Sequence, residues 1–340
     1  MHSTQPQDYC IATIGSHTAL QILKGARDEG MRNLVIVTPK TRRIYEHFGV
    51  ADEFLEIPDY RDFFDIEEAI LRKNAIIVPH GTFVSSIGPQ KVKELKVMHY
   101  GTKGILEWES NRDMERQWLE KAGLKLPRIF KSHSKIDRPV IIKFHGAHGG
   151  FGYFIAKTPE EFEERIKKYP GDDDYVIQEY IVGVPVYVHY FYSPITEELE
   201  IMGFDKRYES NADSIGRIAA RDQLVADIQT SYTITGNIPL MVRESLLPGL
   251  YEMGERVVKT SQELVGKGLY GPFCLEGIMD TNLNYYVFEI SARIVAGTNP
   301  YIQGSPYTWL RYNEPMSTGR RLARDIKQAI EKGELEKVLG

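Results

Sequence analysis

The stretch PVIIKFHGAHGGFGYFIAKTPEE, residues 139–161, decides the fold expected for the second half of this chain. An apolar run opens it, four of the seven residues 146–152 are glycine, and the apolar run YFIA follows at 153–156. Thr158, with Glu161 three positions later, is typical of a capped helix start. The stretch therefore predicts a strand, a glycine loop, a returning strand and a helix.

Lys143 lies inside the first apolar run, where a charged side chain needs a partner. Glycines let the backbone approach an anion closely and point several N–H groups at it. We therefore expect Lys143 and the loop 145–152 to bind phosphate, although the loop does not match the Walker A pattern. The alternative is a flexible hairpin with a lysine whose amine reaches solvent.

Upstream of this stretch, short β-rich runs alternate with helical ones, beginning with a helix expected at 19–30. Strands are expected at 10–15, 34–38, 53–57 and 75–79. Buried strands that alternate with helices favour a parallel sheet covered by helices on both faces. Residues 1–102 are therefore expected to form an α/β domain.

The segment Gly15-Ser16-His17-Thr18 lies where the first expected strand meets the first helix. Thr18, with Gln21 three positions later, predicts a capping box. A helix N-terminus at the carboxyl end of a parallel strand offers free N–H groups and the positive end of the helix dipole. The segment is thus either an anion site or a turn whose polar residues only cap the helix.

Glu276 and Glu289 lie in two strand-like runs that flank the turn 280–284. Their midpoint falls inside that turn, so in a hairpin their Cβ atoms would be about 5 Å apart. Such carboxylates repel unless one is protonated or a cation such as Mg²⁺ lies between them. Strand alternation puts Ser291 and Arg293 on the face of Glu289. The alternative is that one glutamate faces solvent and Arg293 pairs with the other.

Composition excludes several classes of protein. The net charge of −5 argues against a nucleic-acid partner, and no apolar run approaches the ~20 residues that span a membrane. Cys10 and Cys274 lie far apart in apolar runs, which predicts buried thiols in a reducing compartment. We therefore expect a cytoplasmic protein.

The order of these parts resembles the ATP-grasp superfamily, and several longer segments are similar to the archaeal formate-dependent synthetases of 5-formaminoimidazole-4-carboxamide ribonucleotide (FAICAR). The similar segments are GSHTALQILKGA (15–26), QEYIVGVPVY (178–187), RYESN (207–211), GNIP (236–239), GPFCLEG (271–277) and FEISARIVAGTNPYIQGSPYTWLRY (288–312). The resemblance implies a mixed α/β and α+β fold. It places a Rossmann-like pre-ATP-grasp domain at 1–102, an ATP-grasp domain at 103–340, and within it a glycine-loop lid at about 128–182.

The resemblance also implies a ligase of purine biosynthesis that uses ATP and Mg²⁺ or Mn²⁺. Such an enzyme converts aminoimidazole carboxamide ribonucleotide (AICAR) and formate to FAICAR through formyl phosphate, releasing ADP and phosphate. A homo-oligomer, trimeric or hexameric, is implied as well.

Site residues follow from the matching motifs. AICAR would contact His17, Thr82 and Asn237, and Arg293 and Lys143 would be catalytic. ATP would contact Lys143, Gln178, Glu179, Tyr180, Ile181 and Glu209. The metal would be held by Glu276 and Glu289.

The chain departs from the family pattern at three positions. Thr82 stands where the family usually has serine, and His148 and Phe151 stand where the glycine loop usually carries Lys or Arg. The loss of positive charge leaves two alternatives open: another ATP-grasp ligase that joins a carboxylate to an amine, and a nucleotide-binding sensor without turnover.

Overall fold

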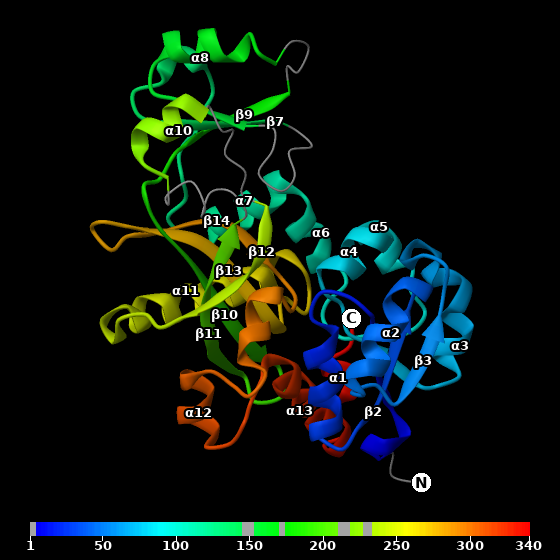
Figure 1. Cartoon of the computed structure of the whole chain (residues 1–340). Helices are drawn as coiled ribbons and strands as arrows, with labels where there is room; N and C mark the ends of the chain where they lie inside the picture. Colours follow the sequence, from blue (N-terminus) through cyan, green and yellow to red (C-terminus); the bar gives the residue numbers. More distant parts are fainter. Residues whose placement is uncertain (1–4, 145–152, 170–173, 210–217, 227–232) are drawn as a thin grey trace.

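The computed structural model describes residues 5–144, 153–169, 174–209, 218–226 and 233–340. The predicted glycine loop, with His148 and Phe151, lies outside the described residues. Three sheets organise the described chain, and Figure 1 shows them as three bodies. The parallel sheet lies beside the antiparallel central sheet, and the smaller lid sheet lies above the latter.

The first sheet is parallel, with strand order β3-β2-β1-β4-β5. Its strands are β1 (Cys10–Ile14), β2 (Arg32–Val37), β3 (Glu53–Glu56), β4 (Ala75–Ile77) and β5 (Met98–His99). The helices between them are α1 (Ala19–Asp28), α2 (Pro39–Phe48), α3 (Glu67–Leu71), α4 (Gly81–Ile87) and α5 (Pro89–Lys93). The four predicted strands are confirmed: the apolar runs of β1, β2 and β4 are buried, and that of the edge strand β3 is half-buried.

The lid sheet is antiparallel, with order β6-β9-β7-β8. Its elements are β6 (Ile129–Phe130), β7 (Val140–Phe144), β8 (Tyr153–Ala156), α8 (Pro159–Ile166) and β9 (Tyr175–Glu179). Thr158 caps α8 by accepting a hydrogen bond from the Glu161 backbone N–H, as predicted. The sheet has a small apolar core of its own, formed with α8.

The central sheet is antiparallel, with order β12-β11-β10-β13-β14. Its strands are β10 (Gly183–Ser193), β11 (Glu198–Glu209), β12 (Ile234–Leu240), β13 (Gly271–Asp280) and β14 (Tyr285–Ser291). The remaining helices are α6 (Ile105–Ser110), α7 (Arg112–Lys121), α10 (Ala220–Ala226), α11 (Leu247–Leu264), α12 (Pro306–Tyr312), α13 (Thr318–Glu331) and the short 3-10 helix η5 (Ala296–Tyr301). Helices α6 and α7 are separate, because Asn111 between them is extended and caps α7.

Helices α7 and α11 cover one face of the central sheet. Trp118 of α7 and Val257 of α11 are fully buried in one cluster with Val188, Phe204 and Leu275 of the strands. Because strand side chains alternate between faces, the residues between these apolar positions point to the other face. That second face carries the polar residues described below.

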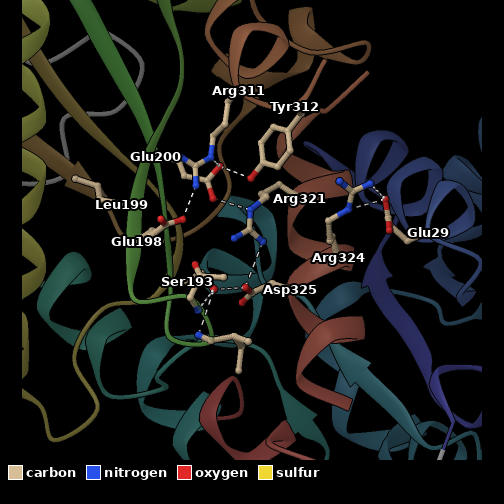
Figure 2. Close-up of polar contacts among 12 residues, drawn as sticks. Glu29, Ser193, Glu198, Leu199, Glu200, Arg311, Tyr312, Arg321, Arg324 and Asp325 are labelled. Atoms are coloured by element: carbon tan, nitrogen blue, oxygen red, sulfur yellow. Dashed lines mark hydrogen bonds and ion pairs between the residues drawn. The ribbon is translucent and has the colours of Figure 1, made fainter. Parts of the chain in front are cut away.

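Helix α13 connects the C-terminal part of the chain to the first sheet. A Cβ added at Gly25 of α1 would clash with the backbone of Gly319, so the two helices touch at glycines. Figure 2 shows the ion pairs around them: Arg321 binds Glu200 of β11 at 2.8 Å and Asp325 at 3.2 Å. The first and central sheets are thus joined through α13.

The capping box predicted for α1 is wrong. Thr18 makes no side-chain cap, and its hydroxyl is buried without a partner among the described residues. Gln21 instead donates to Thr298 Oγ1 (2.6 Å) and accepts from the Gly319 N–H (3.2 Å). The Gln21 side chain thus makes tertiary contacts with Thr298 and Gly319 in place of the predicted local cap.

Candidate active site

A cleft of about 470 Å³ opens between the lid sheet and the polar face of the central sheet. Lys143, Gln178, Glu179, Tyr180, Ile181, Glu209, Glu276 and Glu289 all line it. These are the residues that were predicted for ATP and for the metal, and they come from both sheets. The lid and the central sheet therefore form the two walls of one site.

The two glutamates face each other as the hairpin predicts. Glu276 of β13 and Glu289 of β14 are direct cross-strand partners. Glu276 accepts from Arg207 Nη2 at 2.8 Å and from Ser291 Oγ at 3.2 Å. Burial and the charge of Glu276 raise the pKa of Glu289 to about 7. A buried carboxylate at Glu276, an accessible one at Glu289 and a neighbouring hydroxyl are a donor set that suits a hard divalent cation.

The polar face of the central sheet is continuous across all five strands. Register places on it Tyr187, His189, Asp205, Arg207, Asn237, Glu276, Glu289 and Ser291. Asn237 lies directly opposite Arg207, so the predicted AICAR residue and the guanidinium that holds Glu276 are neighbours. The residues predicted for the metal and Asn237, predicted for AICAR, thus share one sheet face.

Lys143 of β7 is held from the lid side of the cleft. Its ammonium donates to Gln178 Oε1 at 3.4 Å and lies 5.9 Å from the centre of the Phe288 ring. Burial lowers the pKa of Lys143, while the carboxylates of Glu289 and Glu115 oppose that shift. A half-buried ammonium with one long hydrogen bond to a described residue is well placed to receive an anion.

Glu179 has a structural role besides lining the cleft. Its carboxylate accepts from Arg138 Nη1 (2.9 Å) and from the Arg128 N–H (3.1 Å). The Tyr180 N–H donates to the carbonyl of Pro139. These contacts fix the segment that leads from the lid into β10.

Arg112 is a residue that the sequence reasoning missed. Asn111 accepts from two backbone N–H groups of α7, which places Arg112 at the first helical position. Arg112 lines the cleft and also a neighbouring cavity of about 360 Å³, and its charge lowers the pKa of Lys143. It makes no hydrogen bond or ion pair with another described residue. The sequence feature that could have pointed to Arg112 is Asn111, a residue type that often caps the start of a helix.

The segment Gly15–Thr18 forms a separate part of the site. His17 has a left-handed backbone (φ 55°), and its ring stacks on that of His80 at 5.4 Å. Ser16 Oγ lies 3.0 Å from Thr82 Oγ1, so the turn after β1 meets the N-terminus of α4. Burial, His80, Arg293 and Arg207 together lower the pKa of His17 to about 3.

Arg293 connects this turn to the central sheet. A Cβ at Gly81 would lie 3.0 Å from His17 Nε2 and 3.5 Å from Arg293 Cζ, so both side chains flank Gly81. Arg293 pairs with buried Glu109 at 2.9 Å, and not with either glutamate of the hairpin. Its Nε is buried without a partner among the described residues. A donor is thus available beside His17.

The chain is similar to known proteins over almost its whole length. A family model described as a domain of unknown function (DUF1297) matches residues 155–340, and one described as a protein of unknown function (DUF1246) matches residues 11–130. A curated protein of Pyrococcus horikoshii, named 5-formaminoimidazole-4-carboxamide-1-(beta)-D-ribofuranosyl 5'-monophosphate synthetase, is 55% identical over 336 residues, which cover 97% of this chain and 99% of that protein.

Two solved structures share the fold. One is described as an IMP biosynthesis protein, PurP, from Thermococcus kodakaraensis; it is 31% identical with a TM-score of 0.78, over 97% of this chain and 100% of that one. The other is an ADP complex of purK, an N5-carboxyaminoimidazole ribonucleotide synthetase. It is 14% identical with a TM-score of 0.67, over 96% of this chain and 78% of that one, and it supports the fold alone.

Proposed function

Because this chain belongs to the family of FAICAR synthetases, we propose that it joins formate to AICAR with ATP, giving FAICAR, ADP and phosphate. It is an ATP-grasp ligase of purine biosynthesis that forms a C–N bond. The observation that carries the proposal is the cleft in which lid residues for ATP face the Glu276–Glu289 pair.

ATP would lie in this cleft between the two sheets. Gln178, Glu179, Tyr180, Ile181 and Glu209 would surround the nucleoside. Lys143 and Arg112 would bind the phosphates, because both cations line the cleft beside Glu289.

Glu276 and Glu289 would hold Mg²⁺, or Mn²⁺ in its place. When bound, the cation neutralises charge on the phosphates during transfer. Arg207 and Ser291 keep the Glu276 carboxylate in position for that task.

The AICAR residues come from two elements that face each other across the domain boundary. His17 lies in the turn after β1 and Thr82 in the first turn of α4, and Arg293 reaches the same place from just after β14. The Asn299 amide of η5 donates to the His17 carbonyl (3.1 Å), which fixes the turn. A fixed turn would place the weakly nucleophilic AICAR amine against the acyl carbon, and such placement contributes much of the rate.

The reaction would run in two steps. A formate oxygen attacks the γ-phosphorus and ADP leaves, which gives formyl phosphate. The AICAR amine then attacks the formyl carbon, phosphate leaves, and the amine loses its proton. Lys143 would stabilise the transferred phosphoryl group, and the buried Arg293 donor would hold the acyl phosphate.

ADP release, measured with AICAR in the presence and absence of formate, tests this function. We expect release only when both are present. Release that needs AICAR but not formate would favour another ATP-grasp ligase, and nucleotide binding without release would favour a sensor.

We also propose that the chain forms a homo-oligomer. Trp309 and Leu310 of α12 are 51% and 83% exposed, and Ile302 nearby is 43% exposed, so an apolar surface is available to a second copy. Cys10 and Cys274 are buried free thiols, which supports a reducing compartment such as the cytoplasm. No described helix is long and apolar enough to cross a membrane.

A further inference from the structure

Asp205 is a buried carboxylate at the centre of the polar sheet face. Its side chain is fully buried, and Oδ1 accepts from His189 Nε2 at 2.8 Å. Oδ2 accepts from Asn237 Nδ2 at 2.7 Å and lies 3.8 Å from Arg207 Nε. Gly297 packs so closely on Asp205 and His189 that a Cβ there would clash with both. The carboxylate therefore cannot turn away.

The chemistry of Asp205 decides which way the Asn237 amide faces. A carboxylate accepts hydrogen bonds and donates none, so it can receive only the NH₂ group of an asparagine. The carbonyl Oδ1 of Asn237 is then the group that remains for a ligand. Asn237 is half-buried on the edge strand β12, on the same face as Arg207 and Glu276.

We propose that Asp205 is a positioning residue that sets substrate specificity: it turns the carbonyl of Asn237 toward the ligand, so the site accepts an N–H donor. This inference rests on the proposed function, in which Asn237 contacts AICAR. AICAR carries two such donors on neighbouring ring positions, the 5-amino group and the 4-carboxamide. A ligand with an oxygen acceptor in the same place would meet the Asn237 carbonyl and be rejected.

His189 makes the inference sharply testable. In Asp205→Asn, where His189 keeps its proton on Nε2, that N–H still needs an oxygen at the Oδ1 position, so the new amide nitrogen faces Asn237. Asn237 must then turn its own carbonyl toward residue 205 and present NH₂ to the ligand. The isosteric substitution therefore changes the site from one that accepts an N–H donor to one that accepts an oxygen acceptor.

The experiment measures affinity by calorimetric titration for AICAR and for two analogues. One analogue has a 4-carboxylate in place of the carboxamide, and the other lacks the 5-amino group. We expect wild type to prefer AICAR over at least one analogue by tenfold or more, and this preference to fall at least tenfold in Asp205→Asn.

Two controls separate the outcomes. ATP affinity within twofold of wild type shows that Asp205→Asn is folded. Asn237→Ala, on an edge strand, removes the carbonyl together with the hydrogen bond to Asp205 Oδ2, and should also lose the preference. If both Asp205→Asn and Asn237→Ala keep the preference for AICAR over the analogues, the inference is overturned while the proposed function stands. Wild type that binds ATP but not AICAR overturns both.

Discussion

Glu289 would supply one of the two carboxylates of the proposed metal site, opposite Glu276. Replacing it by glutamine should reduce Mg²⁺-dependent turnover by about a hundredfold or more, because one of two ligand carboxylates is lost. ATP binding without metal should persist. Because the repulsion from Glu276 disappears, the metal-free variant should also melt at a higher temperature. Turnover equal to wild type in Glu289→Gln would remove this residue from the metal site.

Arg112 and Arg116 form a matched pair one turn apart on α7. Arg112 has no described partner and lines the ATP cleft, whereas Arg116 pairs with Glu120 at 2.9 Å and does not line it. Arg112→Ala should weaken ATP binding about ten- to a hundredfold, the value of a hydrogen bond to a charged group. Arg116→Ala should stay within about twofold. Equal losses of ATP affinity in both variants, measured by nucleotide titration, would show that only the net charge of the protein matters and not the position of Arg112.

The turn between β1 and α1 belongs to the element scale. His17→Ala should weaken AICAR binding by on the order of ten- to a hundredfold and leave ATP binding nearly intact, because ATP lies against other elements. Separate calorimetric titrations of the two ligands measure this. If both affinities fell together, or neither changed, the turn would serve only to connect β1 to α1.

Strand β5 carries a pH-dependent contribution to stability. His99 is 1% exposed, its Nδ1–H donates to the Gly101 carbonyl at 2.9 Å, and burial lowers its pKa to about 4. The unfolded imidazole takes up its proton near pH 6.5, before the folded one does. The free energy of unfolding is therefore unaffected above pH 6.5 and falls between pH 6.5 and 4, by about 2 kcal/mol at pH 5 for this residue.

Denaturant unfolding of His99→Phe at pH 7 and pH 5 checks this. The variant should be less stable at pH 7 by about 1 kcal/mol, because the Gly101 carbonyl loses its donor. It should lose less stability than wild type on going to pH 5. An unchanged difference between the two pH values would show that His99 takes no part in the acid sensitivity.

Helices and strands could be predicted from the sequence where a local pattern of apolar residues coincides with burial in the structure. The strands of the first sheet are short apolar runs, and the hairpin around 280–284 brings Glu276 to Glu289 through register alone. The failures have distant causes. Gln21 looked like a capping residue, but its amide is used by Thr298 and Gly319, which no local pattern reveals.

At the scale of the whole molecule, the buried ion pairs in Figure 2 hold α13 against the central sheet. Arg321 and Arg311 both bind Glu200, but their side chains are 3% and 44% exposed. Arg321→Ala should cost about 3–5 kcal/mol, because it removes the ion pair of buried Asp325 and leaves buried Glu200 with only the exposed Arg311. Arg311→Ala should cost about 0–1 kcal/mol. Chemical denaturation of both variants measures these losses of stability. Similar losses would show that the burial of the arginine does not determine how much its ion pairs stabilise the fold.

Part of the site could be predicted only through the resemblance. The Glu276–Glu289 pair follows from spacing, and Lys143 from a charge inside an apolar run. Nothing local brings Arg293 beside His17, because that approach depends on how the first sheet docks on the central one. Asp205 was also missed, since a single aspartate in a strand carries no pattern; its meaning comes from His189 and Asn237 around it.

The glycine contact between α1 and α13 also has a consequence for biosynthesis. Ile22 and Ala26 of α1 share a buried cluster with Leu322 and Ile326 of α13, and Gln21 lies 298 residues before Gly319. At ~5–20 residues per second, the ribosome needs roughly 15–60 s to make the intervening chain. Throughout that interval the side of α1 that packs on α13 has no cover, so this surface is exposed to aggregation until α13 emerges and closes it.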